Sequence, residues 1–170
     1  MKRLVILLAT ALTVAPYPVA AQGTTRVTGG GTGTFNADLD GDGDIDGSQF
    51  GMGVIIRGDT ARGHFECLMA GRSDILGLPL MAVEGKVDNG TAHADGSLSF
   101  SGTASVNLAN GHIFRDVPFT VRVTAGGPGI GTLQLTVIGA FDGVPGDTSS
   151  GNGNYDLPPE TVNSGQIQIH

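Results

Sequence analysis

Apolar and polar residues alternate with a period of two along most of the chain that follows residue 22. The clearest segment is 97–108, where Leu98, Phe100, Ala104, Val106 and Leu108 alternate with Ser, Thr and Asn residues. In an extended strand, successive side chains point to opposite faces of the sheet. The pattern therefore predicts a β-strand with one buried face and one face in water.

Seven further segments show the same alternation, and none shows a convincing helical period. Their expected inward-facing residues are Phe35, Ala37 and Leu39; Phe50, Met52, Val54 and Ile56; Phe65, Cys67 and Met69; Met81, Val83 and Val87; Phe119, Val121 and Val123; Leu133, Leu135 and Val137; and Ile167 and Ile169. The chain is therefore expected to form about eight strands, each of which buries one face.

The connections between these segments are short and contain residues that favour turns. Asn110-Gly111, Asn89-Gly90 and Asp95-Gly96 are typical hairpin turns, because both residues of each pair tolerate a positive φ. No connection has room for a crossover helix with a clear apolar face, which argues against parallel strands. We predict a single antiparallel all-β domain and favour a barrel over a sandwich, because hairpins would link most consecutive strands.

The first 21 residues have the pattern of a secretory signal peptide. Lys2 and Arg3 precede an apolar run over residues 4–14, and small residues at 19–21 suit cleavage after Ala21. The run is shorter than the ~20 residues that a membrane-spanning helix needs. We therefore expect residues 1–21 to be removed and residues 22–170 to form the domain. The expected location is secreted, periplasmic or at the cell surface, without membrane insertion.

The chain is acidic, and this narrows the classes of partner. Loss of the positive charges of Lys2 and Arg3 would change the formal net charge from −7 to −9. A surface of this sign repels phosphate groups, so nucleic acid and anionic lipid are not expected partners. Divalent metal ions and polycations remain possible partners.

Cys67 is the single cysteine, so an intramolecular disulfide cannot form. It shares a predicted strand face with Phe65 and Met69, and we expect a buried thiol rather than a nucleophile. His64 and Glu66 occupy the other face, where a solvent-facing pair is expected rather than a metal site, since no third ligand follows at a recognisable spacing.

The strongest chemical signal is a run of aspartates at alternate positions. Five of the thirteen aspartates, Asp38, Asp40, Asp42, Asp44 and Asp46, lie within nine residues. Calcium prefers hard oxygen ligands, and alternate carboxylates in a loop can converge on one ion. Carboxylates this close together repel each other without a cation. The spacing therefore predicts a calcium site, and the alternative is an acidic, solvated hairpin loop.

The segment from Asp38 to Gln49 resembles the calcium loop of EF-hand and dockerin proteins. With Asp38 at position 1, Gly43 falls at the sharp turn and Ile45 at the apolar position 8. Position 12 is Gln49, where the family pattern has an acidic residue, and both flanks are expected strands rather than helices. The resemblance therefore implies calcium binding by the loop and does not imply a helix-loop-helix fold.

Residues 141–161 lack periodicity although they lie between two good strands. The segment contains Asp142, Asp147, Asp156 and Glu160, and Tyr155 is its only aromatic residue. A loop of this length is typical either of a binding loop, in which Tyr155 would stack on a sugar ring, or of a flexible solvated connection. A glycan or another cell-surface partner is therefore a candidate.

The whole mature chain resembles small exported bacterial β-domains of unknown function, of the post-COAP type. The resemblance rests on the Gly-rich stretch 29–35, Gly63-His64-Phe65, residues 100–107 and the closing residues 165–170. It implies an exported β-rich module, and it assigns neither an activity nor site residues.

The sequence thus favours a non-catalytic secreted β-domain that binds calcium through Asp38–Asp46 and serves surface interaction or structure. The alternative is an enzyme or small-molecule binder that uses the lumen of a small barrel, as in allene-oxide-cyclase-like and dirigent-type barrels. The expected inward positions are almost all aliphatic residues, Phe, Gly or Ala, which favours a solid core over a reaction chamber. Convergent polar groups inside the barrel would favour the alternative.

Overall fold

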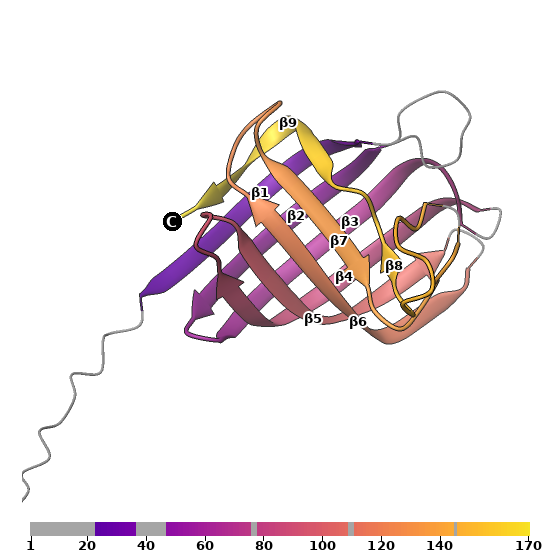
Figure 1. Ribbon diagram of the computed structural model, residues 1–170, viewed down its shortest axis with the longest axis horizontal. Helices are drawn as coiled ribbons and strands as arrows, with labels where there is room; N and C mark the ends of the chain where they lie inside the picture. The colour runs from indigo at the N-terminus through magenta and orange to yellow at the C-terminus, as the bar shows by residue number, and fades with distance from the viewer. Residues whose placement is uncertain (1–22, 37–46, 76–77, 109–110, 145) are drawn as a thin grey trace, which may run out of the picture.

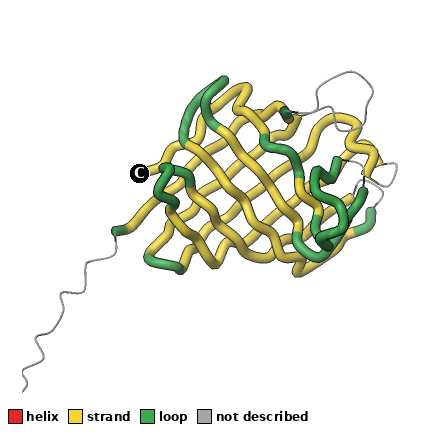
Figure 2. Tube along the Cα trace, in the orientation of Figure 1, coloured by secondary structure: helices red, strands yellow, loops and turns green. Residues whose placement is uncertain are grey.

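The computed structural model describes residues 23–36, 47–75, 78–108, 111–144 and 146–170, and it contains only strands, turns and loops over these residues (Figure 2). None of this part of the chain forms a helix that could cross a membrane. The strands are β1 (Thr24–Phe35), β2 (Gly47–Arg57), β3 (Thr60–Ile75), β4 (Leu78–Ala92), β5 (Leu98–Leu108), β6 (Ile113–Thr124), β7 (Thr132–Val137), β8 (Tyr155–Asp156) and β9 (Glu160–Ile169).

All nine strands belong to one antiparallel sheet, which confirms the predicted fold class. Each strand from β1 to β6 pairs with the next one along the chain, and β9 pairs with both β7 and β1. The hydrogen-bonded neighbours therefore form a closed ring in which the first and last long strands lie side by side (Figure 1). Within the described residues, the two-residue strand β8 pairs with β7 alone. The choice of a barrel over a sandwich stays a prediction.

The alternation in the sequence decides which side chains fill the interior. In β2, Phe50, Met52, Val54 and Ile56 are all buried, as predicted, and the same holds for the inward residues of β5. Aromatic rings fill the centre: the ring of Phe65 stacks on Phe119 at 5.7 Å between centroids and meets Phe100 edge-on at 5.8 Å. Such ring pairs add specific geometry to the burial of apolar area.

Glycine leaves space for this aromatic cluster on β4. A Cβ placed on Gly85 would lie 2.5 Å from two ring carbons of Phe119, which is too close for any side chain. The residue type at position 85 is therefore set by the ring that packs over it.

The prediction of a turn at Asn89-Gly90 is wrong. Both residues lie inside β4, where the register with β5 shifts between Val87 and Asn89. A Cβ on Gly90 would lie 2.7 Å from Ile56 side-chain carbons, so this glycine serves close packing rather than a turn. A glycine inside a strand is a usual sign of such a bulge or close approach. The turn at Asp95-Gly96 is confirmed, with a φ of 81° at Gly96.

Candidate functional site

The predicted calcium ligands Asp38, Asp40, Asp42, Asp44 and Asp46 lie outside the described residues. The structure does fix the two strands that they connect. Thr34 of β1 and Gly47 of β2 are antiparallel partners, so the segment between them joins neighbouring strands. Gln49, the residue at the twelfth loop position, lies within β2 with an exposed side chain. The calcium site stays a prediction.

A polar cluster that the sequence analysis did not predict lies inside the ring. It consists of Ser48 near the start of β2, Cys67 of β3 and Glu160 at the start of β9, with exposed fractions of 3%, 1% and 1%. Glu160 is the register partner of Leu133 on β7 and of Phe35 on β1, both of which face the core. The backbone pairing therefore turns the carboxyl group toward the interior.

The Glu160 carboxyl group is only partly satisfied by hydrogen bonds. The Ser48 hydroxyl donates a short hydrogen bond to Oε2. Oε1 is buried, and no donor in the described part of the chain reaches it. Gly33 of β1 provides the space for this side chain, since a Cβ at that position would overlap Oε2. A buried acceptor without a donor is uncommon in folded proteins and costs free energy.

Burial sets the protonation of both acidic groups in the cluster. Desolvation raises the pKa of Glu160 to about 7, although the hydrogen bond from Ser48 opposes the rise. Burial also raises the pKa of the Cys67 thiol, the charge of nearby Glu160 adds to the rise, and Ser48 again opposes it. Cys67 is therefore a protonated core thiol, as predicted, and does not have the thiolate character of a nucleophile. Glu160 is the group that can exchange a proton near neutral pH.

The signal for this cluster was present in the sequence. Ser48 lies two residues before Phe50, and Glu160 lies two residues before Val162, so both continue a period-two inward set. A polar residue at the end of such a set is normally read as the point where the strand leaves the core. Only the register of β9 between β1 and β7 shows that Glu160 faces inward.

The loop between β7 and β9 is held together by carboxylates. Asp142 accepts hydrogen bonds from the backbone N–H groups of Gly151 and Gly153, at 2.6 and 2.9 Å. Asp147 accepts from three backbone N–H groups, those of Gly143, Ser149 and Asp156. The carboxylate oxygens of Asp142 and Asp147 therefore satisfy the loop's own backbone N–H groups.

Tyr155 does not provide an exposed platform for a sugar. Its exposed fraction is 0%, and it pairs with Val137 of β7 through the short strand β8. The prediction that this ring could stack on a sugar is therefore wrong. A tyrosine in a stretch without periodicity gave no sign of its direction, and the side chain packs into the core because β8 returns to the ring.

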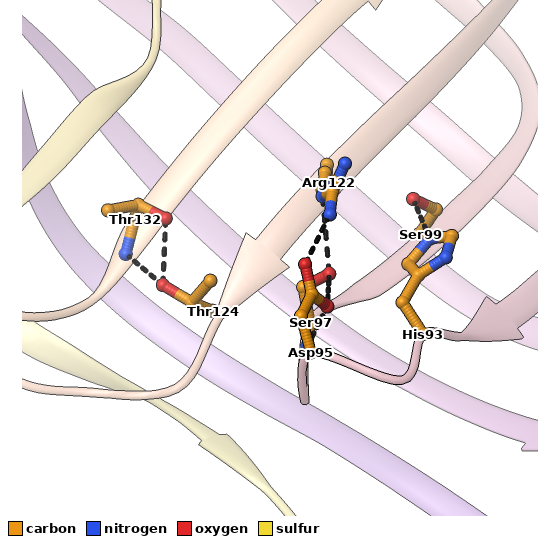
Figure 3. A network of polar contacts seen from close by, with 7 residues as sticks. All are labelled: His93, Asp95, Ser97, Ser99, Arg122, Thr124 and Thr132. Atoms are coloured by element: carbon orange, nitrogen blue, oxygen red, sulfur yellow. Dashed lines mark hydrogen bonds and ion pairs between the residues drawn. The ribbon is translucent and has the colours of Figure 1, made fainter.

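The turn between β4 and β5 is fixed by a second polar network (Figure 3). Asp95 Oδ1 accepts from the backbone N–H and hydroxyl of Ser97, and Asp95 Oδ2 pairs with Arg122 of β6 at 2.6 Å. His93 Nε2 lies 2.8 Å from Ser99 Oγ. The bonds from Ser97, and then the Arg122 charge, lower the pKa of Asp95 to about 2. The contacts tie one turn to the neighbouring strand, which is a structural role.

The outer face of β3 carries the expected solvent-facing pair. His64 Nε2 lies 2.7 Å from Glu66 Oε1, and the two side chains are 57% and 61% exposed. Their register partners on β4 are Lys86 and Glu84. Among the described residues, no three His, Cys, Asp or Glu side chains are arranged to hold a metal ion.

Comparison of the chain with protein-family models, with curated proteins and with solved structures finds no match.

Proposed function

We propose that the protein is an exported, non-catalytic β-domain that acts through its surface and binds calcium through Asp38–Asp46. The non-catalytic, surface-acting role rests on one observation, which is the filled interior. Apart from the cluster that contains Ser48 and Glu160, the inward positions of the described ring are filled by buried apolar side chains, from Val27 on β1 to Ile167 on β9. A core packed in this way supports the shape of the outer surface and leaves recognition to that surface.

The interior cluster of Ser48, Cys67 and Glu160 is the feature that favours the alternative, a binder or enzyme that uses the lumen. Three convergent polar groups, two of them with a raised pKa, are typical of functional sites. Each of these residues is, however, at most 3% exposed. A substrate would have no contact with them in this conformation, so the surface role is the better supported of the two.

Two observations support a calcium-binding connection between β1 and β2. The first is the spacing of the five aspartates, which matches the oxygen-rich loops that hold calcium. The second is the pairing of Thr34 with Gly47, which fixes both ends of the segment on one rigid sheet. A loop with fixed ends loses less conformational entropy when an ion orders it.

Thermal unfolding with and without calcium tests the calcium site. An ion that binds only the folded state stabilises it by about 2.7 kcal/mol at a hundredfold excess over the dissociation constant. We expect millimolar calcium to raise Tm, and magnesium to raise it less, because magnesium demands a tighter octahedral shell. The Asp40→Asn/Asp42→Asn variant should lose most of the rise.

The matched control is Asp59→Asn/Asp88→Asn, which removes the same two charges from the β2–β3 turn and from β4. It should retain the full calcium response. Calorimetry that detects no calcium binding up to about 10 mM, beyond the range of extracellular modules, would reduce the segment to a solvated acidic loop.

Export is tested by the N-terminus of the protein recovered from its native host. We expect mature chains to begin at or near Gln22, because small residues at 19–21 suit signal peptidase. Intact chains that begin at Met1 and remain with the cell membrane would contradict the proposed location. A glycan array on the exported form then tests the candidate glycan partner.

A further inference from the structure

The ring of strands closes through one thin seam. Strand β9 pairs with β1 at nine positions but with β7 at only two, Thr132 with Thr161 and Leu133 with Glu160. A few backbone bonds extend the seam: the N–H of Val162 donates to the Gly131 carbonyl at 2.8 Å, and Gly126 bridges to Ile167. Local opening is therefore expected to involve this seam before the longer ladders.

Glu160 lies in this seam and connects three strands. Its backbone pairs with Leu133 of β7 and Phe35 of β1, and its side chain takes the hydrogen bond from Ser48 of β2. Its Oε1 atom is buried without a donor in the described part of the chain. The side chain thus occupies the point where β9 joins the rest of the ring.

Among the described residues, no positively charged group acts on Glu160 to balance a negative charge. The contacts from β1, β2 and β7 come from Gly33, Ser48 and Leu133, none of which carries a charge. The titratable group that faces it is Cys67 of β3, whose thiol stays protonated. An ionised Glu160 would therefore be an uncompensated buried charge, which is strongly unfavourable, whereas a neutral carboxyl group is tolerated.

We propose that Glu160 is a proton-operated latch: protonated, it lets β9 close against β7, and ionised, it opens this seam to water. Opening transfers the carboxylate from the core to solvent, where its charge is hydrated. The proton released is the only chemical change, so the switch needs no ligand and is reversible.

The direction of the pH response follows from linkage. The pKa of Glu160 is raised to about 7 in the closed ring, above its ordinary value of 4.5. Its contribution to closure is therefore fully present below pH 4.5 and is lost as the pH rises through 7. The seam is closed in mildly acidic surroundings and opens more often in neutral or alkaline ones.

Hydrogen exchange on the full chain at pH 5.5 and pH 8, corrected for intrinsic exchange rates and run in chelator, tests the latch. We expect amide protection in β9 and in residues 126–137 to fall on the order of tenfold at pH 8, while β4 and β5 change little. The Glu160→Gln variant should abolish this pH response. Glu84→Gln removes the same charge from the exposed face of β4, and this variant should retain the wild-type pH response.

Ser48→Ala provides a second readout that does not depend on the folding of Glu160→Gln. The Ser48 hydrogen bond lowers the pKa of Glu160, so its loss should move the midpoint of seam opening to higher pH. The proposal is overturned if wild-type protection in β9 is the same at both pH values. It is equally overturned if Glu160→Gln responds to pH as the wild type does, or if Ser48→Ala leaves the midpoint unchanged.

Discussion

A methyl group added to Gly33 would compete with Glu160 for the same space. Because a Cβ at this position overlaps the buried carboxyl oxygen Oε2, Gly33→Ala must displace either the carboxyl group or β1 itself. Overpacking of this kind typically destabilises by about 1–3 kcal/mol. Urea unfolding at pH 5.5, where Glu160 is neutral, should show a loss in that range.

Gly51→Ala is the matched control for this substitution. A Cβ on Gly51 meets no atom within 4 Å, and this glycine is not among those with a positive φ. Replacement at such a site reduces the freedom of the unfolded chain and should leave stability unchanged or raise it by up to about 1 kcal/mol. Equal losses for the two variants would show that Gly33 does not make room for Glu160.

Cys67 should behave as a core residue in thiol chemistry. It is 1% exposed, and burial raises the pKa of its thiol, so neither access nor thiolate is provided. A thiol reagent should label the native protein only after denaturant is added. Cys67→Ser should destabilise by roughly 1–3 kcal/mol, because burying a hydroxyl costs more desolvation free energy than burying a thiol, and should not alter calcium binding. Labelling of the native protein within minutes would indicate an accessible, functional thiol instead.

The inward direction of some interior residues could be predicted from the sequence, and that of others could not. Period-two alternation predicted buried Phe50, Cys67 and Val106 correctly, because burial of apolar area decides the direction of such strands. The same reasoning missed Ser48 and Glu160, because it assigns apolar residues to the inward face of a strand and these two inward residues are polar. The direction of Glu160 follows from the pairing of β9 with β1, and its contact with Ser48 likewise joins residues more than a hundred positions apart.

At the scale of elements, the β7–β9 loop should depend on Asp147. Partial desolvation acts to raise the pKa of Asp147, but hydrogen bonds from the backbone of Gly143, Ser149 and Asp156 outweigh it, and the net pKa is lowered. Asp147→Ala leaves these three N–H groups without an acceptor, so limited proteolysis should cut within residues 141–157 much faster than in the wild type.

The pH dependence of that effect has a definite sign. A carboxyl group whose pKa is lowered on folding stabilises the folded form above its ordinary pKa of 3.8, and the contribution is lost as the pH falls through the lowered value. The wild-type loop should therefore remain resistant at pH 5 and become susceptible only in strong acid. Asp59→Ala, a substitution in the β2–β3 turn, should leave the cleavage pattern unchanged; faster cutting there as well would point to a general effect of charge.

Some elements could be predicted from the local sequence pattern, whereas others depend on packing against distant residues. Hairpin strands such as β2 and β5 were predictable, because their alternation is strong and their partners are adjacent in sequence. Asn89-Gly90 misled because the same dipeptide serves a turn or a bulge, and only the packing of Ile56 against Gly90 distinguishes the two. Strand β8 was not predictable, since two residues give no period and their pairing with β7 is set by the whole loop.

At the scale of the molecule, closure joins the first and last strands into a single core. Ile167 of β9 is 2% exposed and opposes Gly29 of β1, while its backbone bridges to Gly126 after β6. The backbone of Ile167 therefore joins β9 to the chain on both of its sides. The stability of the ring should therefore depend on β9 as a whole. At a pH where the Glu160 carboxyl group is neutral, β9 should not unfold as a separate unit.

Ile167→Ala tests whether the closed ring unfolds as one unit. Truncation of a buried isoleucine costs about 2–5 kcal/mol, and in a single cooperative core the loss must appear in global unfolding. Far-ultraviolet circular dichroism reports on all strands, and tyrosine fluorescence of residues 22–170 reports on Tyr155, which pairs with Val137 at the far end of β7. At pH 5.5 the urea midpoint of unfolding should fall by the same amount with both probes, and the slope of the free energy of unfolding against urea should stay unchanged. Ile130→Ala, at a position 71% exposed, should change stability by no more than about 0.5 kcal/mol. The opposite outcome is a fluorescence midpoint that stays at the wild-type urea concentration while the dichroism midpoint falls. It would show that β9 unfolds separately from the strands around Tyr155, and that the ring is not one cooperative core.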